Sequence, residues 1–294
     1  MPQQDDVFAK LEWKKGRLLL EDLVFEIDDD GSGRREPGEP GFTFLKPKRM
    51  IDEYTRLWRL RDDFAPRNIL ELGIHAGGSI VFWFEVFQPD RLVAIDIAST
   101  GDNSLLRQYV ASRGLQDRIK THWETSQADS QRLEQIVAAD FSGRLDMVID
   151  DASHVYELTK TSFETLFPLL RPGGLYIIED WSWACWSNLP ADFNPSMTKL
   201  PAGMGLSDLS LPRLICEIVV SAGKMEGFLS QSDGFLSLKP IIADVHVYPD
   251  FVVIERGEAD PAAIGQFKLE RHVPTWRRAT PRGLLRRVLR KITS

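Results

Sequence analysis

Between residues 46 and 257, short apolar runs alternate with longer segments whose apolar residues recur every three or four positions. Short apolar runs are typical of buried strands, and the longer pattern is typical of amphipathic helices. The expected strands are 68–73, 91–95, 119–122, 147–149, 175–178, 241–247 and 251–254, and the expected helices are 47–64, 80–87, 104–113, 131–139, one beginning near 155, and 211–222. This alternation predicts βαβ units, that is, a mostly parallel sheet with helices on both faces.

The last two apolar runs, 241–247 and 251–254, flank the tripeptide Tyr248-Pro249-Asp250. Two strand-like runs around a short turn-forming segment predict a hairpin. We expect this hairpin to add an antiparallel strand to the sheet. Residues 46–257 are therefore predicted to form one core domain.

The segments on either side of this core differ from it in composition. Residues 1–45 are predicted to be an N-terminal extension, with a small hairpin within 7–28 and a polar, Gly- and Pro-rich loop at 28–41. That loop is either a lid over an active site or a solvated linker. Residues 258–294 are predicted to end in a basic amphipathic helix, which either lies on an anionic membrane or a partner, or packs on its own domain.

The composition argues against several classes of function. The net charge of −7 disfavours a general nucleic-acid binder, although the last 18 residues carry seven Arg or Lys and no acid. The two cysteines, Cys185 and Cys216, do not make a disulfide framework. No apolar run approaches the roughly 18 residues of a membrane span, and the N-terminus lacks an apolar signal core. These features predict a soluble cytoplasmic protein.

A glycine turn follows the first strand of the core. Glu71 and Gly73 end that strand, and the segment Ala76-Gly77-Gly78-Ser79 opens the next helix. Glycines let the backbone approach a ligand, and a helix N-terminus offers free N–H groups. Asp96 ends the second strand, 25 residues after Glu71, where a carboxylate can bind both hydroxyls of a ribose. The pattern predicts a site for an adenosine-containing ligand, and its glycine spacing disfavours a nicotinamide-dependent oxidoreductase.

Three carboxylates follow two other strands. Asp151 follows 147–149, and Glu179 and Asp180 follow 175–178. Neighbouring parallel strands end at the same edge of a sheet, so these acids are expected to converge. Without basic partners they repel each other unless a cation lies between them, and oxygen ligands suit Mg²⁺, with Mn²⁺ as a substitute. His154, one helical turn beyond Asp151, is then placed to take a proton from a substrate hydroxyl.

Each of these residues also has a structural interpretation. Asp151 or Ser153 caps the helix that begins near residue 155. His154 is a packed structural residue, and Asp180 is a loop carboxylate. Asp150 points away from Asp151 if the strand continues, so it either supports the site from behind or contacts a ligand on the cofactor side.

These motifs resemble those of class I S-adenosylmethionine-dependent methyltransferases. The matching segments are NILELGIHAGGS, RLVAIDI, LRPGGLYIIED and VHVYPDFVVIERG, within residues 48–257. The resemblance implies a Rossmann-like α/β fold whose seven-stranded, mostly parallel sheet has one antiparallel strand and helices on both faces. The middle glycine of the family's E/D-x-G-x-G-x-G motif is His75 in this chain.

The resemblance also implies which residues hold S-adenosylmethionine. Glu71, Gly73 and the backbone near residues 76–79 would bind its methionine part, and Asp96 its ribose. Residues 123–127, after the third strand, would lie by the adenine. The implied cofactor-binding residues are therefore Glu71, Gly73, Ala76, Gly77, Gly78, Ser79, Asp96, Ser126, Gln127 and Asp150.

The segment DDASH, followed by FETLFPLLRPGGLYIIED, is more specific. It resembles the metal-dependent sugar O-methyltransferases that act on macrolide deoxysugars, and the related cephalosporin-hydroxylase-like group. This resemblance implies that Asp151, Glu179 and Asp180 bind Mg²⁺ and that His154 is the catalytic base.

The expected function is an S-adenosylmethionine- and Mg²⁺-dependent O-methyltransferase that acts on a hydroxyl of a sugar or glycosylated metabolite. The alternatives are methylation of a catechol or other small phenol, and a non-catalytic interaction protein with a methyltransferase fold. The clustered Trp181, Trp183 and Trp186 are either a platform for the acceptor or packing residues. The sequence leaves open the acceptor and whether the chain forms a homo-oligomer.

Overall fold

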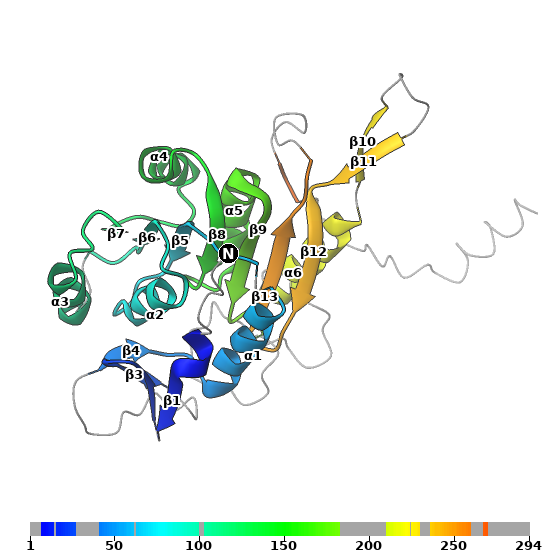
Figure 1. The fold of residues 1–294 in the computed structure, drawn as a ribbon. Helices are drawn as coiled ribbons and strands as arrows, with labels where there is room; N and C mark the ends of the chain where they lie inside the picture. Colours follow the sequence, from blue (N-terminus) through cyan, green and yellow to red (C-terminus); the bar gives the residue numbers. More distant parts are fainter. Residues whose placement is uncertain are drawn as a thin grey trace, which may run out of the picture.

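A seven-stranded sheet forms the centre of the computed structural model (Figure 1). Its strands lie in the order β12-β13-β9-β8-β5-β6-β7, and the last five of these are mutually parallel. β13 is antiparallel to both of its neighbours, as the sequence predicted. The strands are β5 (Asn68–Leu72), β6 (Arg91–Ile95), β7 (Ile119–His122), β8 (Leu145–Asp150), β9 (Leu170–Glu179), β12 (Ile242–Val247) and β13 (Phe251–Arg256).

The structure describes residues 7–14, 16–27, 41–61, 63–99, 103–182, 210–223, 225–229, 236–259 and 267–269. Three expectations lie outside these residues: those for the polar loop at 28–40, for Trp183 and Trp186, and for the basic tail helix. Among the described helices, none combines the length and apolar character that a membrane crossing requires.

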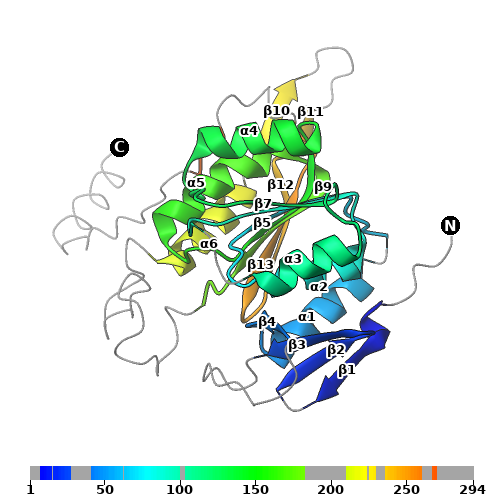
Figure 2. The ribbon, with the colours of Figure 1, turned by 90° about the vertical axis from the view of Figure 1, so that its left-hand side faces the viewer.

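Alternate side chains of the central strands enter two separate apolar clusters. Met147 and Ile149 of β8 belong to one cluster and Val148 to the other. The first cluster contains α1 (Lys48–Arg59), α2 (Gly78–Phe87) and α3 (Ser104–Ser112), and the second contains α4 (Ser130–Phe141), α5 (Tyr156–Leu166) and α6 (Leu211–Ala222). Helices therefore cover both faces of the sheet, as predicted (Figure 2). A short 3₁₀ helix, Phe167–Leu169, leads from α5 into β9.

The N-terminal residues form a second sheet against the α1–α2 side of the core (Figure 2). After the 3₁₀ helix Val7–Lys10, β1 (Leu11–Lys14) and β2 (Arg17–Leu20) make the predicted hairpin, and β3 (Leu23–Ile27) and β4 (Phe42–Phe44) complete four strands. The rings of Phe44 and Phe82 lie 4.7 Å apart. A Cβ on Gly78 would lie 2.0 Å from the Thr43 carbonyl oxygen, so β4 packs directly on the start of α2.

Two features differ from the expected pattern. The segment Pro172-Gly173-Gly174 lies inside β9, where the pairing with β8 shifts between Leu145 and Met147, so the expected turn is an irregularity within a longer strand. A two-stranded hairpin, β10 (Met225–Leu229) with β11 (Leu236–Pro240), was not predicted. Neither feature changes the edge at which β5, β6, β8 and β9 end.

Candidate active site

The glycine loop between β5 and α2 has a left-handed backbone at each of its three motif positions. The φ angles are +98° at Gly73, +47° at His75 and +82° at Gly77. A side chain disfavours this conformation, although histidine tolerates it better than bulky or branched residues. His75 therefore keeps the loop conformation that a glycine would give at the middle position.

Gly73 brings the glycine loop against the acidic loop that follows β8. A Cβ at Gly73 would lie 2.3 Å from the Asp151 carbonyl oxygen, and the Asp151 N–H donates to the Leu72 carbonyl oxygen at 2.9 Å. Only a residue without a side chain fits this contact. The two predicted halves of the site are therefore immediate neighbours.

Asp96 braces the glycine loop. One oxygen of its carboxylate accepts from the N–H groups of Ile74 (2.8 Å) and His75 (3.1 Å), and the other accepts from the Ala98 N–H (2.8 Å). A carboxylate has about four acceptor positions, so three donors leave room for one more. The ribose role stays a prediction, and the observed role is to hold the loop.

Glu71 lies beneath the same loop with no exposed surface. Neither of its carboxylate oxygens has a hydrogen-bond partner among the described residues. Burial raises the pKa of Glu71 to about 7, with the nearby Ser79 side chain and Lys46 acting in the opposite direction. A buried carboxylate without well-formed hydrogen bonds is costly, and a ligand that donates to it would remove this cost.

Gln127 and Asp150 form a buried network behind the acidic loop. The Gln127 amide donates to Asp150 (3.1 Å) and accepts from the Ser153 N–H (3.0 Å). The other Asp150 oxygen accepts from the hydroxyls of Ser162 (2.7 Å) and Tyr176 (2.8 Å), and burial raises the Asp150 pKa to about 6. These contacts fix the loop that carries His154. The adenine contact expected for Gln127 and for Ser126, whose hydroxyl accepts from the Ala128 N–H at 3.2 Å, stays a prediction.

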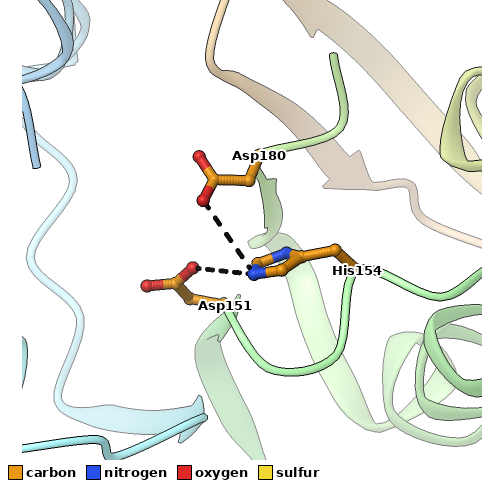
Figure 3. Close-up of side chains that lie close together, drawn as sticks. All are labelled: Asp151, His154 and Asp180. Carbon is orange, nitrogen blue, oxygen red and sulfur yellow. Dashed lines mark ion pairs between the residues drawn. The ribbon is translucent and has the colours of Figure 1, made fainter. Parts of the chain in front are cut away.

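Asp151, His154 and Asp180 point toward one another at the carboxyl ends of β8 and β9 (Figure 3). The His154 Nε2 atom lies 3.8 Å from Asp151 Oδ1 and 3.9 Å from Asp180 Oδ2, and the three ligand atoms lie within 4.8 Å of one another. His154 and Asp180 have left-handed φ angles of +53° and +54°. Backbone strain of this kind is found where a fold fixes functional side chains.

The electrostatics of this group reflect burial and mutual repulsion. Burial raises the pKa of Asp180 well above its usual value, and Asp151 and Glu179 add to the effect. Burial raises the pKa of Glu179 to about 8, while Lys46 and Tyr54 act in the opposite direction. Burial also lowers the pKa of His154, against the attraction of Asp151. A neutral imidazole and crowded carboxylates suit both proton acceptance and binding of a cation.

Lys46 is the residue that the sequence reasoning missed. Its Nζ donates to Asp151 Oδ2 at 2.9 Å and forms an ion pair with the Glu179 carboxylate, which also accepts from the Tyr54 hydroxyl at 2.5 Å. Against the effect of burial, Asp151 and Glu179 hold the pKa of Lys46 above its usual value. The premise that the acids converge without a basic partner was therefore wrong. One signal was available: a cluster of acids needs a counter-charge somewhere in the chain.

The donor set fits a hard divalent cation in its chemistry. Asp151, His154 and Asp180 offer two carboxylate oxygens and one imidazole nitrogen within 4.8 Å. The carboxylate oxygens of Asp151 and Asp180 would hold such an ion, and the His154 Nε2 atom beside them would stay the proton acceptor. Glu179, the third predicted ligand, is adjacent but is engaged by Lys46 and Tyr54. The metal roles of all three carboxylates stay predictions.

Comparison with known proteins agrees with the motifs. Residues 70–181 match a family model described as a methyltransferase domain. This segment runs from within β5 to just beyond β9 and contains both the glycine loop and the acidic loop. The match confirms, for this part of the chain, the resemblance to methyltransferases.

Two proteins of similar sequence are O-methyltransferases. The chain is 33% identical over 201 residues to the demethylmacrocin O-methyltransferase of Streptomyces fradiae. This match covers 64% of this chain and 44% of that protein. It is 29% identical over 265 residues to the mycinamicin VI 2''-O-methyltransferase of Micromonospora griseorubida, with 84% of this chain and 57% of that protein covered. These relatives confirm the resemblance to the macrolide-sugar O-methyltransferases.

A solved structure is also similar. It is described as the MycE methyltransferase from the mycinamycin biosynthetic pathway in complex with Mg, SAH and mycinamycin VI, with 27% sequence identity and a TM-score of 0.48. The match covers 80% of this chain and 54% of that one. The chain spans about half the length of the curated relatives it matches.

Proposed function

We propose that this protein is an S-adenosylmethionine- and Mg²⁺-dependent O-methyltransferase acting on a hydroxyl of a sugar or glycosylated metabolite. The observation that carries the proposal is the contact between Gly73 and Asp151. It joins a loop suited to the methyl donor to an edge suited to a metal and a base. A methyl donor and an activated hydroxyl must meet within a few ångströms for transfer.

Donor binding is supported by the loop geometry and by Glu71. The N-terminus of α2, which begins at Gly78, and the buried Glu71 carboxylate suit the charged methionine part of S-adenosylmethionine. Asp96, which already holds the loop through Ile74 and His75, would complete the site at the ribose. Asp96 would thereby hold the glycine loop in its binding conformation before the donor binds.

Metal binding is assigned to Asp151, Asp180 and Glu179, with His154 at the same cluster. When bound, Mg²⁺ would supply a Lewis acid that acidifies an acceptor hydroxyl. Glu179 can contribute only if its contact with Lys46 loosens or is shared. The set is rich in oxygen, which suits Mg²⁺ better than a thiol-seeking metal.

His154 is assigned as the general base. Its pKa is lowered by burial, so the imidazole is neutral near pH 7 and can accept a proton. The imidazole would take the proton of the acceptor hydroxyl as that oxygen forms a bond to the methyl carbon. The bond between this carbon and the sulfonium sulfur breaks, and its electron pair stays on sulfur.

The saccharide acceptor is supported by the names of the relatives. They are O-methyltransferases of demethylmacrocin, of mycinamicin VI and of a rhamnosyl-tetracenomycin. The proposal includes a cytoplasmic location, as in an enzyme that uses a metabolic methyl donor. It commits to a hydroxyl acceptor on a sugar and leaves the particular glycoside to experiment.

The test is methyl transfer to a panel of acceptors, followed by mass spectrometry as a gain of one methyl group. The panel contains deoxysugar glycosides, free vicinal diols and catechols. We expect turnover on a glycoside that is lost with EDTA and restored by Mg²⁺. Turnover confined to catechols would favour the phenol alternative, and failure to bind S-adenosylmethionine in calorimetry would favour a non-catalytic protein.

A matched pair of histidine variants tests the base. His154→Ala should bind S-adenosylmethionine normally but lose most of its turnover, on the order of 100-fold, because proton transfer contributes that much. His246→Ala is the control, since His246 lies on β12, two strands from β9, and pairs with the exposed Asp244. Equal rates in the two variants would remove His154 from the mechanism.

A further inference from the structure

The ammonium group of Lys46 contacts two members, Asp151 and Glu179, of the acid cluster that Asp151, Glu179 and Asp180 form. Only 4% of its side chain is exposed, and it contacts Asp151 at 2.9 Å and pairs with Glu179, which is fully buried. Lysine is almost never this buried without a strong partner. Here it has two, and both are carboxylates proposed above as metal ligands.

The backbone fixes where this lysine can reach. Lys46 follows β4 by two residues, and its N–H donates to the Phe44 carbonyl oxygen at 2.7 Å. β4 itself is held on the first turn of α2 by the close approach of Thr43 to Gly78. The packing of the N-terminal sheet on α2 therefore fixes the position of Lys46 beside the acids.

The contacts divide the carboxylate oxygens between two cations. Asp151 uses Oδ2 for Lys46, while its Oδ1 faces His154 and Asp180. Glu179 uses Oε2 for Lys46 and Oε1 for the Tyr54 hydroxyl. A metal that takes Oδ1 of Asp151 shares this ligand with Lys46, and a metal that takes Glu179 must draw it away from Lys46.

The formal charges support the same division. With a metal bound, all three acids would be ionised and would carry a charge of −3, and Lys46 brings this to −2, which one divalent cation neutralises. A unit positive charge near a divalent ion weakens the binding of that ion, roughly tenfold at a separation of about 5 Å even with the screening of water. Lys46 thus lowers the metal affinity while it neutralises repulsion in the metal-free state.

We propose that Lys46 is an internal counter-cation that holds the acid cluster together without metal and limits its affinity for a divalent ion. This rests on the proposed function only in taking the cluster as a metal site. Lys46 is a positioning residue in this role, because it acts through Asp151 and Glu179. Loss of Lys46 is therefore predicted to have opposite effects on two quantities. It lowers the stability of the metal-free protein, and it raises the affinity for the metal.

The test uses the full chain with Lys46→Gln, which keeps a hydrogen-bond donor but removes the charge. Lys48→Gln is the matched control, because Lys48 lies two residues further on and pairs with the exposed Asp52 at 2.7 Å. Lys46→Arg restores the charge. Thermal unfolding is followed in EDTA, and Mg²⁺ binding is measured by calorimetry without S-adenosylmethionine or acceptor.

We expect Lys46→Gln to melt roughly 5 °C or more below the wild type in EDTA, since carboxylates lose a buried partner. It should bind Mg²⁺ at least tenfold more tightly, Lys48→Gln should match the wild type, and Lys46→Arg should return toward it. Unchanged or weaker Mg²⁺ binding in Lys46→Gln would overturn the inference. If the variant is unfolded in EDTA, recovery of folding on adding Mg²⁺ supports the inference, and no recovery overturns it.

The outcomes separate this inference from the proposed function. A wild type without methyl transfer, beside a Lys46→Gln variant with tightened Mg²⁺ binding, keeps the inference and removes the function. A wild type with Mg²⁺-dependent turnover, beside variants that all bind Mg²⁺ equally, does the reverse. Absence of Mg²⁺ binding in both wild type and Lys46→Gln would overturn both.

Discussion

The glycine loop and the acid cluster touch at one edge of the sheet, yet they are assembled in different ways. The loop is local: Glu71, Gly73 and Asp96 lie within one βαβ unit, and Asp96 is hydrogen-bonded to residues 21 and 22 positions before it. The cluster is long-range, because Lys46 and Glu179 are 133 positions apart. A local arrangement is readable from spacing, and a long-range one requires the fold.

The largest expected effect comes from breaking the contact between the two regions. Gly73→Ala places a Cβ 2.3 Å from the Asp151 carbonyl oxygen at a φ of +98°, so clash and backbone strain add. We expect a loss of about 3 kcal/mol or more in the free energy of unfolding, together with loss of S-adenosylmethionine binding. Urea unfolding and calorimetry measure the two.

Gly143→Ala is the control for this substitution. Gly143 has a φ of +85°, but a Cβ there would meet nothing within 4 Å. It should therefore lose only the strain of a left-handed alanine, about 1–2 kcal/mol. Equal losses at Gly73 and Gly143 would mean that the contact with Asp151 contributes nothing.

This difference also explains how much of the molecule could be predicted. The seven strands of the central sheet and the convergence of Asp151 with Asp180 follow from apolar periods and crossover rules. Lys46 could not be found in the same way, because the segment around it, Phe44-Leu45-Lys46-Pro47, has no pattern that marks a buried cation. Its position depends on how a separate sheet packs on α2.

The second prediction concerns Glu71, beneath the glycine loop, whose substitution should raise stability but weaken donor binding. Glu71 has a pKa of about 7 against an ordinary value of 4.5, so its favourable contribution to stability is present below pH 4.5 and is lost as the pH rises to 7. Glu71→Gln should therefore raise the free energy of unfolding at pH 8, on the order of 2–3 kcal/mol. The same variant should bind S-adenosylmethionine more weakly.

The pH dependence is the internal control for Glu71→Gln. At pH 5 the folded wild type already keeps Glu71 protonated, so the gain should fall to roughly 1 kcal/mol or less. Urea unfolding of both proteins at pH 5 and pH 8 measures the difference. A gain that is the same at both values would mean that ionisation of Glu71 is not its cause.

The third prediction acts on the acid side. Tyr54→Phe removes the hydroxyl that donates to Glu179 at 2.5 Å and should lower the free energy of unfolding by about 1.5–3 kcal/mol. Tyr109→Phe removes a similar bond to Glu85 at 2.6 Å and should cost a comparable amount. Only Tyr54→Phe should change the affinity for Mg²⁺, because Tyr54 contacts a proposed metal ligand and Tyr109 does not. Equal Mg²⁺ affinity in the two variants would show that Glu179 is not a ligand of the metal.

The smallest effect is expected at His75, the one position where the loop departs from its motif. His75 is exposed and has a φ of +47°, so His75→Gly relieves about 1–2 kcal/mol of backbone strain. The new glycine also gives the unfolded chain about 0.4–1 kcal/mol of extra conformational entropy, which opposes the gain. The net change should be a stabilisation of at most about 1 kcal/mol.

Ser142→Gly offers the same change away from the site, because Ser142 is exposed at the end of α4 with a φ of +53°. Both variants should be stabilised alike in urea unfolding, and both should bind S-adenosylmethionine within about twofold of the wild type, since backbone shape is kept in each. A selective loss of affinity in His75→Gly would show that the imidazole itself contacts the donor. The glycine loop would then bind the donor through the His75 side chain as well as through its backbone.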